Sequence, residues 1–237
     1  MLAFSAPEDR HFQGHGFFSN DGRLLFATEN DFDGERGVMG IYDVKLGYRR
    51  IGEIDTAGIG PHEALLLSDG RTVAIANGGI LTHPDFPRQK LNLATMAPSL
   101  VYADLARGDI IESVSLSPEL HQLSIRHMAE DGNGRIWFGG QFEGARDETV
   151  ALAGWHERGR DIQLCSAPET LWQSMNNYVG SVAASSDGRR VAMSSPRGGT
   201  VLVWDCASGS VMEQRRIRDV CGLASRSGAF LSSDGTG

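Results

Sequence analysis

One pattern of hydrophobic and polar positions returns along the chain. An alternating apolar run leads into a tight turn that contains glycine, a second apolar run follows, and Gly-rich residues come next. Alternation with a period of two is typical of half-buried β-strands, and an Asp-Gly turn between two such runs predicts a β-hairpin. The turn glycines are Gly22, Gly70, Gly134, Gly188 and, in a fifth copy, Gly228. They lie 48, 64, 54 and 40 residues apart, which brackets the period of propeller blades.

Two further strands follow the hairpin in several copies. The third strand is predicted at 38–43, 99–104 and 201–205, and the fourth at 48–54, 110–116 and 210–217. Four antiparallel strands in each repeat predict an all-β fold, a β-propeller of four-stranded antiparallel blades. We expect a single propeller domain over residues 1–237, with approximate blades at 14–57, 58–117, 124–166 and 178–218 and a partial blade at 219–237. The chain is expected to be part of a seven-bladed ring, incomplete at both ends.

Two other fold classes fit the pattern less well. A doubly wound α/β fold needs helices of ten or more residues between its strands, whereas only short helical candidates are found, at 95–97, 118–123 and 169–175. A β-sandwich also uses short strands, but it gives no reason for the same hairpin to recur with the same leading residues. The repeated hairpin therefore favours the propeller.

The amino-acid composition excludes several classes of protein. The 237 residues include 30 glycines and are 41% apolar, which is enough for a core and excludes disorder and collagen. The formal net charge of −8 argues against nucleic acid as a partner. No apolar run approaches the roughly 20 residues that a membrane-spanning helix needs, so no membrane insertion is expected. The N-terminus lacks a signal peptide, and an exported protein would need a signal outside this chain.

The three cysteines, Cys165, Cys206 and Cys221, are odd in number and widely spaced. They form neither a disulfide framework nor a CxxC metal site. The sequence also lacks a nucleophile elbow, a P-loop, a Rossmann fingerprint and an HExxH motif. No cofactor is therefore predicted from a motif.

Three histidines occupy the same place in successive repeats, just before the predicted innermost strand. His15 lies seven residues before Gly22, His62 eight before Gly70, and His127 seven before Gly134. In a propeller this position lies at the mouth of the central channel, where converging imidazoles are candidate ligands for a transition metal (iron, copper or zinc) or an anionic group. In the fourth and fifth repeats, Ser181 and Cys221 occupy the position of the histidine. In the structural alternative, the histidines bind neighbouring backbone or carboxylate groups and lock adjacent blades together.

Polar, Gly-rich loops should open on the same face as the histidines. Glycines let a backbone approach a ligand closely. The loop around Glu29 also has alternating carboxylates, for which a solvated acidic hairpin is the alternative to a cation site. Arg126, Asn177 and Arg197 suggest an anion or carbohydrate pocket, although amide-rich loops more often bind backbone groups. The candidate ligand-binding residues are His15, Glu29, Asn30, His62, Glu63, Asn77, Arg126, His127, Asn177 and Arg197.

Several longer strings resemble a bacterial family called domain of unknown function 1513. They are Gly14-His-Gly-Phe-Phe-Ser-Asn-Asp-Gly-Arg, Gly58-Ile-Gly-Pro-His-Glu, Ala76-Asn-Gly-Gly-Ile-Leu-Thr-His-Pro, Leu123-Ser-Ile-Arg-His, Asn177-Tyr-Val-Gly-Ser-Val and Ser195-Pro-Arg-Gly-Gly. The resemblance implies a propeller similar to WD40 and YVTN types, exported by a twin-arginine signal and encoded near imelysin-type components of iron uptake. It therefore implies a periplasmic location and a link to iron acquisition, and it implies no established activity.

These observations lead to three hypotheses about function. The leading one is a non-enzymatic periplasmic propeller that binds a protein partner, such as an imelysin-type protein, or a small ligand at its channel mouth. The alternative is a metal-binding or catalytic propeller with lyase- or oxidoreductase-like chemistry at His15, His62 and His127. A purely structural scaffold is the third.

Overall fold

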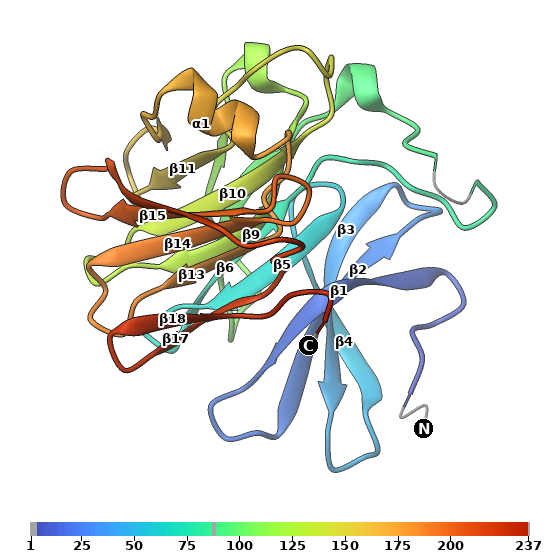
Figure 1. Cartoon of the computed structure of the whole chain (residues 1–237). Coiled ribbons are helices and arrows are strands. Elements are labelled where there is room, and N and C mark those ends of the chain that lie inside the picture. The colour runs from blue at the N-terminus through green and yellow to red at the C-terminus, as the bar shows by residue number, and fades with distance from the viewer. Residues whose placement is uncertain (1–3, 87–88, 237) are drawn as a thin grey trace. The chain divides into compact units, whose positions relative to one another are not determined.

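The computed structural model describes residues 4–86 and 89–236, and nearly all of its regular structure is β-strand. The described residues form four sheets of four antiparallel strands and one sheet of two (Figure 1). Within each sheet the hydrogen-bonded order of the strands follows their order in the sequence. This arrangement results from short turns between consecutive apolar runs, and it confirms the predicted all-β fold of four-stranded blades.

Contacts within the chain divide it into two compact units, Met1–Ile125 and Arg126–Gly237. The expected single domain and the number of blades in a ring stay predictions. The first unit holds two complete sheets. One comprises β1 (Arg10–Phe18), β2 (Leu24–Asp31), β3 (Arg36–Asp43) and β4 (Arg49–Asp55), and the other β5 (Pro61–Leu66), β6 (Thr72–Asn77), β7 (Ser99–Asp104) and β8 (Ile110–Ser115).

The third sheet begins at the division between the units, which falls within β9. It comprises β9 (Leu123–Glu130), β10 (Ile136–Phe142), β11 (Ala153–His156) and β12 (Gln163–Leu164). The fourth comprises β13 (Ser181–Ala184), β14 (Arg190–Ser195), β15 (Thr200–Asp205) and β16 (Val211–Arg216), and the two-stranded sheet has β17 (Leu223–Arg226) and β18 (Ala229–Ser232). The predicted third strands therefore correspond to β3, β7 and β15.

Helical structure is confined to connections between strands. The described helices are one α-helix, α1 (Glu169–Ser174), and two 3-10 turns, Leu93–Thr95 and Pro118–Leu120. They lie where the sequence predicts short helical insertions. None of the helices in the described part of the chain has the length and apolar character that crossing a membrane would require.

The turn glycines of the repeat have the backbone conformation that a tight hairpin needs. All five have a positive φ between 65° and 81°, a region in which side chains with a Cβ are strained. At Gly22 the amide donates to the Ser19 carbonyl at 2.8 Å, and the preceding Asp21 accepts hydrogen bonds from the Ser19 hydroxyl and the Arg23 amide. These bonds, the one from Ser19 above all, lower the pKa of the Asp21 carboxyl.

The core of the first unit lies between its two sheets. Strands β6 and β7 are buried along their whole length, and β1 and β5 lie side by side. The cluster that joins the sheets contains Phe26, Met39, Ile54, Ala64, Val73, Ile75, Val101 and Ala103. Because each sheet contributes about half of this cluster, neither would bury its apolar face alone.

In the second unit, tryptophans add to the core. Trp172 of α1 stacks on Trp204 of β15 with ring centroids 5.4 Å apart. Trp137 is fully buried, and its indole N–H donates to the Asp131 carboxylate at 2.9 Å. Trp155 is only half-buried and lies under the Arg135 guanidinium.

A partly buried ionic network crosses the first sheet. Glu29 is fully buried and accepts hydrogen bonds from the Tyr42 hydroxyl and from Arg50, at 2.9 Å. Gly40 leaves the room for this carboxylate, since a Cβ there would overlap it. Arg50 also donates to Glu53, at 2.6 Å, and Arg36 donates to Glu53 at 2.5 Å. These charged side chains therefore join β2, β3 and β4, in addition to the backbone hydrogen bonds between the strands.

Because of Glu53, the stability of the first unit depends on pH in the acidic range. Burial alone would raise the pKa of its carboxyl, but hydrogen bonds from Arg50 and Arg36 outweigh burial and lower it from 4.5 to about 2. A folded-state pKa below the unfolded one stabilises the fold above about pH 4.5, and this contribution is lost as the pH falls toward 2. We expect Glu53→Gln to lower the free energy of unfolding by about 2 kcal/mol at pH 7 and by almost nothing near pH 2.

Urea denaturation at pH 7, 4 and 2.5 measures this difference. Glu157→Gln, on an exposed loop after β11, is the control and should follow the wild type at every pH. A Glu53→Gln variant that loses stability with acid as steeply as the wild type would contradict the assignment.

Candidate functional site

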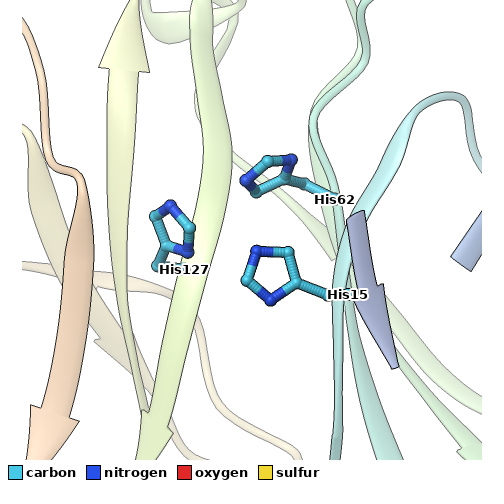
Figure 2. A group of neighbouring side chains, drawn as sticks. All are labelled: His15, His62 and His127. Carbon is cyan, nitrogen blue, oxygen red and sulfur yellow. The ribbon is translucent and has the colours of Figure 1, made fainter. Parts of the chain in front are cut away.

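His15 and His62 lie side by side in the first unit. His15 belongs to β1 and His62 to β5, and both are partly exposed. Their ring centroids are 5.0 Å apart, and the ring planes are inclined by 58° (Figure 2). The two imidazoles that the sequence places at equivalent positions of successive repeats therefore lie close together.

A bulge in β1 presents His15. Phe12 pairs with Glu29 and Gly16 with Ala27, so that three residues of β1 lie opposite Thr28 alone. Gly14 has φ of 104° within this bulge, and Thr28 Oγ1 donates to the His15 carbonyl at 3.0 Å. Bulges bend a strand and redirect its side chains. The string Gly-His-Gly therefore encodes a bulge within β1, which the sequence analysis did not identify.

A second bulge presents His62 on β5. Pro61 pairs with Asn77 and Glu63 with Ala76, which leaves His62 as the additional residue. The preceding Gly60 has φ of 61° and packs against the Ile80 backbone, where a Cβ would have no room. Both β1 and β5 thus depart from regular strand pairing at the residue that carries the imidazole.

Glu63 adds a carboxylate to the pair. Its Oε1 lies 3.8 Å from Nδ1 of His15. The Glu63 side chain is 20% exposed and that of His15 is 35% exposed, so the group is open to solutes. We refer to His15, His62 and Glu63 as the histidine site.

His127 is the third predicted histidine and belongs to β9. This strand begins within the first unit, where Ser124 and Ile125 pack against Gly78 closely enough that a Cβ on Gly78 would have no room. His127 follows Ile125 by two residues on the same strand, so the two side chains share a face. His127 itself belongs to the second unit.

Glu29 and Asn77 are not accessible ligand contacts. Glu29 is fully buried in the ionic network with Tyr42 and Arg50 described above. Asn77 is also fully buried, and its amide donates to the Thr56 carbonyl at 2.8 Å and to Ser99 Oγ at 3.2 Å. Both side chains hold strands together, which corrects their assignment to a ligand-binding surface.

Asn30 lies in an aromatic cluster that the sequence analysis missed. It is 2% exposed, and its amide donates to Thr82 Oγ1 at 3.3 Å while its Oδ1 has no hydrogen-bond partner among the described residues. Phe32 lies between His11, at 5.9 Å, and His83, at 5.1 Å between ring centroids. Burial, and then the charge of His83, lower the pKa of His11. The feature of the sequence that could have indicated this cluster is the aromatic side chain of Phe32 within the acidic loop.

The second unit groups Arg126, Tyr178 and Arg197. The Arg197 guanidinium lies 4.5 Å from the centroid of the Tyr178 ring. Arg126 is partly buried, and its buried Nε has no hydrogen-bond partner among the described residues. Burial lowers the pKa of Arg126, while nearby Tyr178 and Glu143 act in the opposite direction. We refer to Arg126, Tyr178 and Arg197 as the arginine cluster.

Asn177 contributes to this region through its backbone. It has φ of 55°, a left-handed conformation that asparagine tolerates, and its carbonyl accepts the Phe142 amide at 3.1 Å. This bond joins the loop before β13 to the end of β10. The observed role of Asn177 is therefore to position Tyr178 next to it.

Ser181 and Cys221 replace the histidine in the last two repeats. Ser181 Oγ accepts the Leu223 amide at 3.1 Å, and the Cys221 carbonyl accepts the Ser194 hydroxyl. Cys221 is an exposed free thiol, whereas Cys165 and Cys206 are buried. Burial raises the pKa of both buried thiols, which makes them poor metal ligands.

Solved structures confirm the β-propeller fold. The chain is similar to hydrazine synthase of Kuenenia stuttgartiensis, with a TM-score of 0.60 and 11% identity over 93% of this chain and 82% of that one. It is also similar to the β-propeller domain of Cps50 (Swd1) from Myceliophteria thermophila, with a TM-score of 0.63 and 11% identity over 94% of this chain and 62% of that one. At this identity the likeness establishes the architecture alone.

Sequence comparison identifies the family. No curated protein matches the sequence. A family model does match it, over residues 1–237, and the chain belongs to the family described as Protein of unknown function (DUF1513).

Proposed function

We propose that this chain is a non-enzymatic binding protein of the periplasm that takes part in iron acquisition. It binds an anionic group, carried by a small ligand or by a partner such as an imelysin-type protein. The resemblance described in the sequence analysis supports the location, the pathway and this partner. The single observation that supports binding of an anion is the arginine cluster of the second unit.

Arg126 and Arg197 suit a carboxylate for two reasons. A guanidinium offers several N–H donors in a planar fork that matches a carboxylate, and burial strengthens the resulting bonds. Arg126 has a buried Nε with no partner among the described residues, so part of its donor capacity is unused. Tyr178, under Arg197, adds a flat surface and a hydroxyl beside the two cations.

A structural role for Arg126 would require it to stabilise the fold, and the opposite is expected. A partly buried cation with an unpartnered donor costs free energy, and the gain from removing it is on the order of 1 kcal/mol. Arg126→Met should therefore raise the free energy of unfolding by about 1 kcal/mol at pH 7, measured by urea denaturation.

Arg135→Met is the matched variant for this measurement. Arg135 donates to the fully buried carboxylate of Asp131 at 2.8 Å and covers the Trp155 ring. Its removal leaves a buried charge without its cation and should lower the free energy of unfolding by about 3 kcal/mol. A loss of stability in Arg126→Met similar to that in Arg135→Met would show that Arg126 is structural.

Binding is tested by titration calorimetry with citrate and, separately, with a purified imelysin-type protein. We expect the wild type to bind at least one of the two, and Arg126→Gln with Arg197→Gln to weaken that binding at least tenfold. Arg107→Gln is the control, since this exposed arginine belongs to an ion pair with Asp109 in the first unit. Absence of binding to both probes, or equal binding by the double variant, would refute the proposal.

Location is tested in the native bacterium. Osmotic-shock fractionation followed by immunoblotting should find the protein in the periplasmic fraction, together with a periplasmic marker enzyme. Recovery with a cytoplasmic marker would exclude the proposed location.

A further inference from the structure

The histidine site of the first unit has the separation that a shared metal ligand pair requires. With metal–nitrogen distances of about 2.0–2.1 Å, two imidazoles on one tetrahedral ion place their ring centroids roughly 5 Å apart. The centroids of His15 and His62 are 5.0 Å apart, and the rings are inclined rather than stacked (Figure 2). One ion between them therefore needs little movement of either ring.

Backbone features fix the two strands at the residues that carry the imidazoles. Thr28 fixes the His15 carbonyl, and Gly14 and Gly60 supply the positive φ on which the two bulges depend. If β1 and β5 served only to pair with neighbouring strands, neither would need the extra residues of its bulge. Bulges recur next to functional sites because they redirect one side chain while the sheet continues.

Glu63 provides the supporting carboxylate that metal-binding histidines commonly have. Its Oε1 lies 3.8 Å from Nδ1 of His15, and a small rotation of the side chain would bring the two into hydrogen-bond distance. A carboxylate at Nδ1 fixes the proton there and leaves Nε2 as the ligand atom, with a higher basicity. Glu63 is thus a positioning residue for His15.

We propose that His15 and His62 bind one divalent transition-metal ion. Imidazole nitrogens select ions of intermediate softness, such as Zn²⁺, Cu²⁺, Ni²⁺ and Co²⁺, over Mg²⁺ and Ca²⁺. Two imidazoles leave two positions of a tetrahedral ion open to solvent or to a ligand group. This inference uses residues other than the arginine cluster and does not depend on the function proposed above.

The probes are Zn²⁺ and Co²⁺ alone, added to full-chain protein that has been treated with a chelator and dialysed. We expect one Zn²⁺ for each chain by calorimetry, and visible absorption bands of tetrahedral Co²⁺ in the same stoichiometry. His15→Gln and His62→Gln should each weaken Zn²⁺ binding at least tenfold and abolish the Co²⁺ bands. Glutamine keeps a polar side chain of similar reach, and far-UV circular dichroism checks that each variant is folded.

Two further variants sharpen the assignment. His121→Gln is the control, because this histidine belongs to the loop before β9 and its Nδ1 lies 2.9 Å from the Pro118 carbonyl. It should bind Zn²⁺ like the wild type. Glu63→Gln should weaken binding less than His15→Gln does, while keeping the Co²⁺ bands.

Several outcomes would overturn the proposal. They are no saturable Zn²⁺ binding by the wild type, or binding that folded His15→Gln and His62→Gln variants retain. Citrate and partner binding by the arginine cluster is measured on separate variants, so either proposal can fail without the other.

Discussion

Burial of both faces of the inner strands of the four-stranded sheets is the constraint on which the rest of the structure depends. Strands β6 and β7 have no exposed residue, so the second sheet must be covered on both sides. The cluster around Met39 and Val101 shows the first sheet providing part of that cover. A four-stranded sheet with two apolar faces is stable only in a stack, which explains why one hairpin pattern recurs along the chain.

This constraint leaves freedom within β1 and at the start of β5. A residue in the middle of β6 cannot change without a cavity or a clash, whereas β1 and β5 tolerate inserted residues at their bulges. The two bulges use this freedom. The glycines beside them, Gly14 and Gly60, have positive φ, so the chain accepts a local conformational cost where the core does not require regular pairing.

The fold could be predicted from the sequence because its signals are local and repeated. Turn glycines and alternating apolar runs act within about ten residues, so the predicted strands at 99–104 and 201–205 coincide with β7 and β15. The site was harder to predict because its contacts join distant segments. The sequence suggests that Glu29 is a loop carboxylate. Its burial depends on hydrogen bonds from Tyr42 and Arg50, and only the register of the neighbouring strands places those two residues beside it. His11, Phe32 and His83 likewise meet across about 70 residues of chain.

Strand β9 shows how one strand can serve two kinds of chemistry. Arg126 and His127 are neighbours in the sequence, and successive side chains of a strand point to opposite faces. Alternation therefore separates the Arg126 guanidinium from the His127 imidazole. A regular strand keeps this separation, in contrast to the bulged strands β1 and β5.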